Sequence, residues 1–175
     1  MFVYLGLGSN LGDRAAHLRA GISALKALGT VLALSPVYAS APMYITEQPE
    51  FLNMAALLET QLSAPDLLAG CKRIEHAEGR DLSSAAQRNG PRPLDIDLLL
   101  ALATHEPDNA QVAVRLATPA LVLPHPRLRE RAFVLVPLCD LEPTLIDPRT
   151  GEAICTLADA VRDQPLRKLG DLADF

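Results

Sequence analysis

The residues whose types and spacing most clearly indicate chemistry are two carboxylates, Asp95 and Asp97. They lie in residues 88–100, which read Arg-Asn-Gly-Pro-Arg-Pro-Leu-Asp-Ile-Asp-Leu-Leu-Leu. Pro91 and Pro93 lack the backbone N–H that a sheet needs, so the strand indicated by the aliphatic residues starts only after them. Because side chains alternate along a strand, both carboxylates should point to one face of the sheet.

The other face of this strand should be apolar and should carry the side chains of Leu94, Ile96, Leu98 and Leu100. Two carboxylates roughly 7 Å apart at Cα on such a strand repel each other and lose solvation unless a cation lies between them. Mg²⁺ fits best, because it takes hard oxygen ligands and often combines one or two carboxylates with phosphate oxygens. The alternative is an exposed edge strand with two solvated acids, but the run 98–102 is typical of a buried strand. Arg88 and Arg92 stand just upstream and could hold the phosphates.

The composition indicates one ordinary globular domain over residues 1–175, with 49% hydrophobic and 21% charged residues. A formal net charge of −5 argues against a protein that grips a nucleic-acid backbone. No apolar stretch reaches the roughly 18 residues of a membrane span, so we expect a cytoplasmic monomer that does not bind membranes. The three cysteines, Cys71, Cys139 and Cys155, have no metal-ligand spacing, and we expect buried reduced thiols.

The chain begins with a predicted strand at 2–7 and a glycine-rich turn at 6–12. A helix should follow, because apolar residues recur at intervals of three and four; Asn10 or Asp13 could cap it and Gly29 could end it. The turn reads Gly-x-Gly-x-x-x-Gly, one residue longer than a dinucleotide fingerprint, and no acid ends the next strand. A dinucleotide site is therefore not expected.

The order of the first six elements predicts an α+β fold. Strands are expected at 31–41, with an interruption at Pro36, and at 51–61, followed by a helix at 63–79 and the strand of the two carboxylates. This βαββαβ order is that of a ferredoxin-like antiparallel sheet with helices on one face, which leaves the other face for a ligand or extra structure. The remainder should add extra strands and C-terminal helices: an irregular excursion at 103–120, an apolar run to Leu141, a helix from about Ile154 and a loosely held tail over the last ten residues.

Two residues of the third strand could bind a flat ring. Phe51 and Asn53 share a face, so an aromatic ring could stack on a heterocycle whose edge the amide reads. The alternatives are core packing for Phe51 and a turn for Asn53. On the following helix, Lys72 and Glu75 lie nearly one turn apart and form either a solvated surface pair or a nucleotide contact.

Two arginine-rich stretches could bind phosphate. Residues 123–133 combine three arginines with a proline-flanked His125 and with Phe133; the alternative is a surface helix turn rich in arginine. Residues 80–93 have little periodicity and carry Arg80, Arg88 and Arg92, so we expect a loop that closes over the ligand as a lid.

Five stretches together resemble the hydroxymethyl-dihydropterin pyrophosphokinase (HPPK) family of folate biosynthesis, and they span most of residues 2–143. The block Gly-Pro-Arg-x-Leu-Asp-x-Asp is the most specific of them. The family's fold is ferredoxin-like, and its enzymes are ATP-dependent pyrophosphokinases that transfer pyrophosphate from ATP to 6-hydroxymethyl-7,8-dihydropterin, releasing AMP. The five stretches are residues 6–14, 48–53, 73–75 with 79–80, 88–100 and 123–133.

The resemblance implies that Asp95 and Asp97 bind two Mg²⁺ ions that bridge the phosphates of ATP, the co-substrate. It implies phosphate contacts for Arg92, His125 and Arg131. Arg80 resembles the family's mobile-loop arginine.

For the pterin, the resemblance implies a sandwich between Phe51 and Phe133, with Asn53 reading the edge of the ring. The backbone near Met43 looks like a further contact. Weaker nucleotide or site contacts are implied for Gln48, Lys72 and Glu75, and Arg88 remains a phosphate candidate. Asn89 stands where the family usually has an aromatic residue, so closure of the 80–93 lid should be weaker than usual.

Two other classes of protein compete with this interpretation. An RNA-recognition module of the same fold needs a basic sheet rich in aromatic residues, whereas this chain has 4% aromatic residues and a negative net charge. A small-molecule sensor domain would bind nucleotide or pterin without turnover. AMP formation from ATP in the presence of the pterin alcohol separates the enzyme from the sensor.

Overall fold

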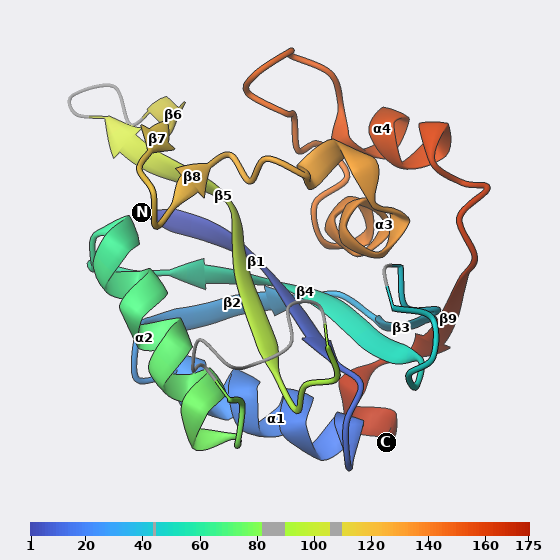
Figure 1. The fold of residues 1–175 in the computed structure, drawn as a ribbon. Helices are drawn as coiled ribbons and strands as arrows, with labels where there is room; N and C mark the ends of the chain where they lie inside the picture. The colour runs from blue at the N-terminus through green and yellow to red at the C-terminus, as the bar shows by residue number, and fades with distance from the viewer. Residues whose placement is uncertain (44, 82–89, 106–109) are drawn as a thin grey trace.

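The centre of the protein is a seven-stranded antiparallel sheet, seen in a computed structural model that describes residues 1–43, 45–81, 90–105 and 110–175 (Figure 1). Its strand order is β6-β5-β1-β4-β3-β9, and β2 also pairs with β4. A separate two-stranded sheet joins β7 and β8. The elements are β1 (Phe2–Ser9), α1 (Arg14–Leu25), β2 (Thr30–Leu34), β3 (Val37–Ser40), β4 (Phe51–Glu59), α2 (Ala64–Ala77), β5 (Asp95–His105), β6 (Ala110–Ala113), β7 (Leu116–Ala117), β8 (Val122–Leu123), η1 (Leu128–Glu130), α3 (Ala132–Leu141), α4 (Ile154–Ala160), β9 (Leu166–Gly170) and η2 (Leu172–Asp174).

The βαββαβ core confirms the predicted ferredoxin-like α+β fold, with β5-β1-β4 in the middle of the sheet. The predicted second strand at 31–41 is two strands in the structure, β2 and β3. Pro36 cannot donate to a ladder, and the chain breaks there, so that β2 pairs with residues 56–59 of β4 and β3 pairs with residues 51–53.

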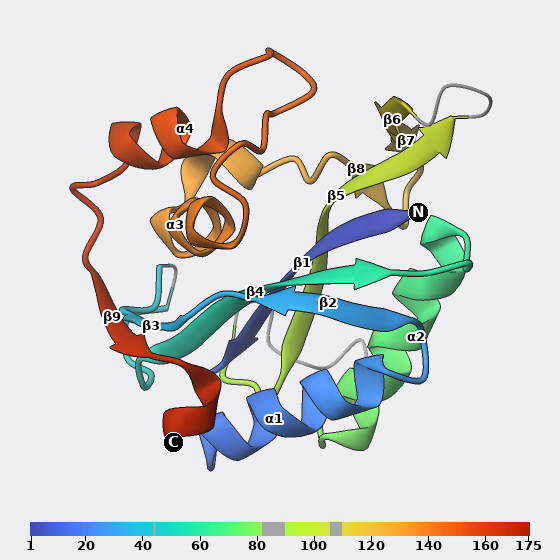
Figure 2. The same cartoon turned by 180° about the vertical axis from the view of Figure 1, so that it is seen from behind.

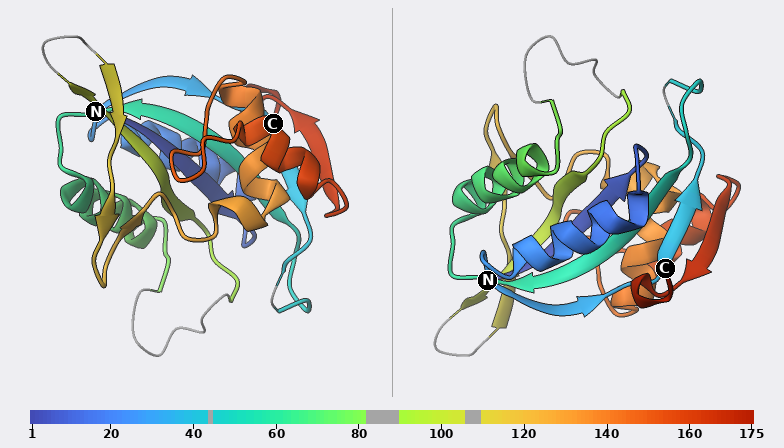
Figure 3. Two further views of the ribbon diagram at one scale, coloured as in Figure 1. Left: turned by 90° about the horizontal axis from the view of Figure 1, so that it is seen from above. Right: turned by 90° about the horizontal axis from the view of Figure 1, so that it is seen from below.

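The two faces of the sheet pack against different helices. Leu7, Leu18, Leu67 and Ile96 belong to the core beneath α1 and α2, whereas the second core joins β5 and β4 to α3 and α4. Figure 3 shows α1 and α2 in front of the sheet when the molecule is seen from below, with α3 and α4 behind it. The C-terminal helices therefore cover only part of the face that we expected to be open, and a pocket lies beside them.

A β-bulge changes which residues of β5 face each core. Leu98 pairs with Leu5 and Leu100 pairs with Tyr4, so Leu99 is an extra residue in the β1–β5 ladder. Strict alternation predicted Leu100 on the same face as Leu98, and this was wrong: Leu98 lies in the α1/α2 core, whereas Leu99 and Leu100 both lie in the α3/α4 core. The carboxylates precede the bulge, so their predicted common face is unaffected.

The C-terminal residues are not the loosely held tail that the sequence suggested. β9 pairs with β3 and closes one edge of the sheet (Figure 2). The excursion at 103–120 is also partly regular, because β5 extends to His105 and pairs with β6; residues 106–109 lie outside the described residues. None of the helices in the described part of the chain is both long and apolar enough to cross a membrane.

The expectation of three buried reduced thiols was wrong for two of the cysteines. Cys139 and Cys155 form a disulfide with their Cα atoms 5.0 Å apart. They are 16 residues apart in sequence, and packing of α3 against α4 brings them together. Cys71 alone is a buried free thiol, and burial, followed by the charge of Glu75, raises its pKa to about 12.

We predict that Gly29→Ala destabilises the fold. Gly29 lies between α1 and β2, and a Cβ there would come within 2.2 Å of the Glu59 carbonyl oxygen, which belongs to the backbone of β4. Strand β4 would have to move to remove this steric clash. Urea unfolding followed by circular dichroism should therefore show that the free energy of unfolding falls by about 1–3 kcal/mol.

Gly70→Ala is the matched control. A Cβ at Gly70 would meet the end of the Leu28 side chain at 2.7 Å, and that side chain can rotate away. Alanine also favours a helix over glycine by about 1 kcal/mol. Equal losses for the two variants would show that the backbone contact at Glu59 does not require glycine.

Candidate active site

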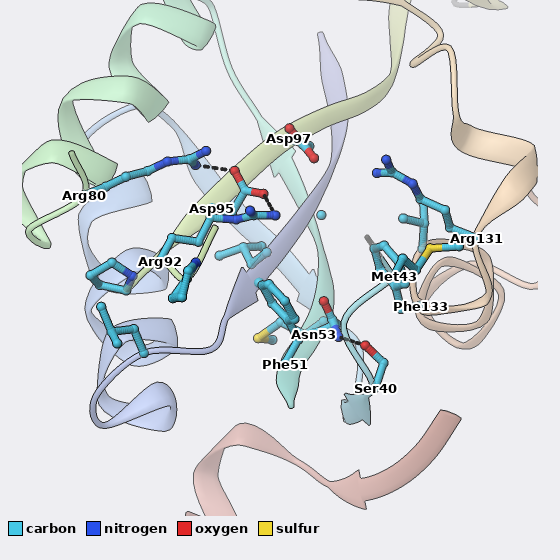
Figure 4. A pocket seen from close by; sticks show the side chains of 18 of the residues that line it. Ser40, Met43, Phe51, Asn53, Arg80, Arg92, Asp95, Asp97, Arg131 and Phe133 are labelled. Atoms are coloured by element: carbon cyan, nitrogen blue, oxygen red, sulfur yellow. Dashed lines mark hydrogen bonds and ion pairs between the residues drawn. The ribbon is translucent and has the colours of Figure 1, made fainter. Parts of the chain in front are cut away.

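A pocket of about 870 Å³ opens on the sheet face that carries α3, at the end of the sheet where β5 begins (Figure 4). Gly8 from β1, Phe51 and Asn53 from β4, and the two carboxylates of β5 contribute to its walls. The charged side chains that line it are basic in the majority: Lys72, Arg80, Arg92, Arg127 and Arg131 against Asp81, Asp95 and Asp97. This balance suits an anionic ligand.

Asp95 is held by two arginines. Arg92 Nη2 lies 3.0 Å from Asp95 Oδ2, and Arg80 Nη1 contacts Asp95 Oδ1 (Figure 4). Burial opposes ionisation of Asp95, but the charges of Arg92 and Arg80 outweigh it and hold the pKa of this carboxyl below its usual value. Asp95 is therefore a carboxylate at neutral pH.

Asp97 points into the same pocket but has a different electrostatic environment. Burial, together with the neighbouring negative charge of Asp95, raises the pKa of Asp97 to about 6. The predicted common face is thus confirmed, since both side chains line the pocket. The two carboxylates leave a local excess of negative charge beside Asp97 that a cation would relieve.

Glu75 is a buried anchor for the basic residues of the site. Its carboxylate accepts hydrogen bonds from Lys72 Nζ at 2.8 and 2.9 Å and from the Ile96 backbone N–H at 2.8 Å, and Arg80 Nη1 lies 3.0 Å away. The side chain is 0% exposed, so the alternative of a solvated surface pair with Lys72 was wrong. Lys72 lines the pocket, whereas Glu75 lies behind it.

Asn10 joins two loops that border the pocket. Its Oδ1 accepts a hydrogen bond from the Arg92 backbone N–H at 2.8 Å, and its Nδ2 donates to Gln48 Oε1 at 3.0 Å. The cap of α1 is instead Asp13, whose carboxylate accepts from the Ala16 N–H. The amide of Asn10 fixes the backbone from which Arg92 extends.

His125 has a fixed backbone and a ring whose Nε2 can donate a hydrogen bond. Its backbone N–H donates to the carbonyl of Leu99, the bulge residue of β5, at 2.8 Å. Its Nδ1 accepts from the Arg127 N–H at 3.1 Å, so the ring proton is on Nε2. Burial, with the charges of Arg131 and Arg127, lowers the pKa of His125 to about 4, so the imidazole is neutral at physiological pH.

The two aromatic residues each lie against an arginine. The guanidinium carbon of Arg92 is 5.1 Å from the ring centre of Phe51, and that of Arg131 is 5.5 Å from the ring centre of Phe133. Both rings line the pocket, so Phe51 is not sealed in the core. Each ring therefore lies in the pocket next to a basic side chain.

Asn53 has a defined orientation at the floor of the pocket. Its Nδ2 donates to Ser40 Oγ at 2.9 Å, and the side chain is 6% exposed (Figure 4). A Cβ at Gly8 would lie 3.2 Å from Asn53 Oδ1, so the absence of a side chain there keeps the amide oxygen accessible. Asn53 lies within β4, which excludes the alternative of a turn residue.

The structure brings most of the predicted site residues into one pocket. Those that line it are Met43, Gln48, Phe51, Asn53, Lys72, Arg80, Arg92, Asp95, Asp97, His125, Arg131 and Phe133. Glu75 is adjacent, and Arg88, Asn89 and most of the proposed 80–93 lid lie outside the described residues. Sequence reasoning missed Ser40 and gave Asn10 only a capping role, because their partners lie 13 and 82 residues away. The register of a hairpin between 37–40 and 51–53 would have placed Ser40 beside the Phe51–Asn53 strand.

No cluster of three or more histidine, cysteine or acidic side chains that could hold a metal ion occurs among the residues that the structure describes. Within the described part of the chain, the metal candidates in the pocket are therefore the carboxylates of Asp95 and Asp97. Mg²⁺ is frequently held by only one or two carboxylates when substrate phosphates supply the remaining ligands.

The fold and the pocket together define a ferredoxin-like α+β protein with a pocket whose charged side chains are mostly basic and include the paired carboxylates Asp95 and Asp97. Residues 4–143 match the family model of 7,8-dihydro-6-hydroxymethylpterin-pyrophosphokinase (HPPK), and the chain belongs to this family. Solved structures agree on the fold: an HPPK-DHPS structure in complex with substrates has a TM-score of 0.66 at 13% identity and covers 93% of this chain, which covers 43% of that one.

Two similar relatives are bacterial proteins called 2-amino-4-hydroxy-6-hydroxymethyldihydropteridine pyrophosphokinase. That of Methylorubrum extorquens is 42% identical over 82% of this chain and 84% of its own length, and that of Bacillus subtilis is 38% identical over 79% and 76%. The folate synthesis bifunctional protein of Pisum sativum is 38% identical over 85% of this chain. The chain spans only 26% of the pea protein and 21% of the fission yeast folic acid synthesis protein fol1.

We predict that Glu75→Gln lowers the free energy of unfolding by about 1–3 kcal/mol, because it removes the buried charge shared by Lys72 and Arg80. The neutral amide has nearly the same shape as the carboxylate, so the loss of unfolding free energy measures the contribution of the charge and its hydrogen bonds. Urea unfolding followed by circular dichroism measures it.

Glu78→Gln provides the comparison one turn further along the chain. Glu78 Oε2 lies 2.8 Å from His17 Nδ1, but both side chains are about a quarter exposed. Such a pair contributes about 0–1 kcal/mol. If Glu75→Gln were no more destabilising than Glu78→Gln, the buried carboxylate would not anchor the two basic side chains.

Proposed function

We propose that this protein transfers pyrophosphate from ATP to 6-hydroxymethyl-7,8-dihydropterin and releases AMP, as an enzyme of folate biosynthesis. The carboxylate pair on β5, flanked by Arg80, Arg92 and Arg131 in one pocket, is the observation that carries this proposal. The names of the bacterial relatives describe this activity and support it.

The proposed metal is Mg²⁺, bound by Asp95 and Asp97. The donor set fits this ion, because Asp97 lies buried beside a second carboxylate and its pKa is raised for that reason. When bound with ATP, Mg²⁺ supplies positive charge to the phosphate oxygens at which negative charge develops.

The basic residues of the pocket are proposed to hold the phosphates of ATP. Arg80 and Arg92 are paired with Asp95 in the structure, so binding of a phosphate chain would exchange this carboxylate for phosphate oxygens on the two guanidinium groups. Arg131 would add a further positive charge. The neutral His125, with its proton on Nε2, would donate one hydrogen bond to a phosphate oxygen.

The pterin is proposed to lie between Phe51 and Phe133, with its edge against Asn53. The hydrogen bond from Asn53 Nδ2 to Ser40 leaves Oδ1 as the group that can accept from the heterocycle. The pterin hydroxyl would attack the β-phosphorus of ATP in line with the departing AMP oxygen. The arginines would stabilise this transition state because they are already in position when the charge develops.

We further propose that residues 1–175 form one domain that acts as a monomer. A single sheet containing both β1 and β9, from opposite ends of the chain, supports the one-domain assignment. We also propose a cytoplasmic location, although the Cys139–Cys155 disulfide of the structure is the form that oxidising compartments favour.

The test of function is the stoichiometry of products. Incubation with ATP, Mg²⁺ and the pterin alcohol should yield equimolar AMP and pterin diphosphate. Nucleotide and pterin binding without AMP formation would instead identify a sensor domain and contradict the enzyme proposal.

We predict that Asp97→Asn reduces turnover by at least about 100-fold, because it removes one of the two anionic metal ligands. The same change should leave the free energy of unfolding unchanged or raise it, since the wild-type carboxylate is buried beside a like charge. Turnover assays and urea unfolding measure the two effects.

Asp159→Asn is the control, because Asp159 is an exposed acid on α4, outside the pocket lining. It should leave both quantities unchanged. Turnover within about twofold of the wild type in folded Asp97→Asn would exclude a ligand role for Asp97.

A further inference from the structure

Gln164 binds two peptide groups at the start of α3. Its side chain accepts a hydrogen bond from the Ala132 backbone N–H at 2.9 Å, and its Nε2 donates to the Glu130 carbonyl at 2.8 Å. These two peptide groups lie immediately after and immediately before Arg131. Gln164 lies beyond residues 4–143, the part of the chain that matches the family model.

The hydrogen bond that Gln164 accepts from the Ala132 N–H caps the start of α3, where the N-cap residue itself makes no side-chain cap bond. Arg131 is the N-cap residue of α3, has extended backbone angles of φ −130° and ψ 116°, and makes no side-chain cap hydrogen bond. The first N–H groups of a helix need acceptors from outside the helix. Gln164 supplies one from 32 residues downstream, and its own backbone N–H is fixed by the Val161 carbonyl at 3.0 Å.

A second part of the same C-terminal region supports the neighbouring residues. Asp147 is completely buried, with Arg149 Nη2 3.0 Å from its carboxylate, and Arg149 Nη1 donates to the His125 carbonyl at 3.4 Å. Arg129 reaches back to the same carboxylate, with Nε 3.7 Å from Asp147 Oδ2. The segment 125–131 is therefore held at both ends by residues that follow residue 143.

We infer that Gln164 is a positioning residue for Arg131. By fixing the peptide groups on either side of Arg131, it sets the direction in which the guanidinium extends into the pocket beside Phe133. This inference rests on the proposed function, in which Arg131 binds the phosphates of ATP. Loss of Gln164 should thus weaken binding of the nucleotide much more than binding of the pterin.

The main test is Gln164→Leu, which keeps most of the side-chain volume but removes both hydrogen bonds. Calorimetry with α,β-methylene-ATP and Mg²⁺ should show nucleotide affinity reduced on the order of tenfold. The KM for the pterin should change by less than about twofold, because Phe133 is also held by the packing of α3 through Val134 and Leu135. Gln164→Glu, which keeps the acceptor for Ala132 but loses the donor for Glu130, should be intermediate.

Lys168→Met is the matched control. Lys168 lies in β9 and its Nζ donates to Asp140 at 2.7 Å, so it also joins the C-terminal region to α3, but at the end of the helix remote from Arg131. It should leave nucleotide affinity unchanged. An equal loss of affinity in Lys168→Met would mean that general attachment of α3, not the orientation of Arg131, is what matters, and would overturn the inference.

A double-mutant cycle shows whether Gln164 affects nucleotide binding through Arg131 or independently of it. In an Arg131→Ala background, Gln164→Leu should change nucleotide affinity by less than about twofold, since the guanidinium that it orients is gone. A full tenfold loss in that background, or no loss in the wild-type background, would contradict the inference. Because calorimetry needs no turnover, absence of AMP formation would reject the proposed activity without deciding this test.

Discussion

The pairing of Asp95 with Arg80 and Arg92 is the interaction on which the rest of the site depends. This pairing keeps the Asp95 carboxylate ionised on a largely buried face of the sheet. It also holds two guanidinium groups at the position where phosphate is proposed to bind. The buried Glu75 forms an ion pair with Arg80, and Asn10 accepts a hydrogen bond from the backbone N–H of Arg92. Burial, together with the negative charge of the ionised Asp95, in turn raises the pKa of Asp97 to about 6.

Much of the fold and the central pair of carboxylates could be predicted from local sequence rules. Alternation placed Asp95 and Asp97 on one face, and the missing N–H groups of Pro91 and Pro93 delayed the strand to Asp95. Alternation failed only at Leu100, where the Leu99 bulge reverses the order. That bulge also exposes a carbonyl to the His125 N–H, so the same irregularity helps to place a proposed phosphate-binding residue.

The parts of the site that could not be predicted depend on contacts distant in sequence. Local patterns cannot tell that Asn10 bonds to Arg92, that Glu75 is buried beneath β5, or that Gln164 brackets Arg131. In each case the residue type is ordinary, and the role arises because the sheet and helices bring two segments together. The prediction of a loosely held C-terminal tail was wrong for the same reason, since β9 is held by pairing with β3, which is distant in sequence.

The most direct test of the central claim is the thermodynamic coupling between Mg²⁺ and nucleotide. If Asp95 and Asp97 hold a cation whose remaining ligands are phosphate oxygens, α,β-methylene-ATP should bind at least about tenfold more tightly in the presence of Mg²⁺ than in the presence of EDTA. Asp97→Asn should abolish most of this difference in affinity. Nucleotide affinity in the wild type that is the same with and without Mg²⁺ would contradict the account, because the carboxylate pair would then have no cation to share with the phosphates.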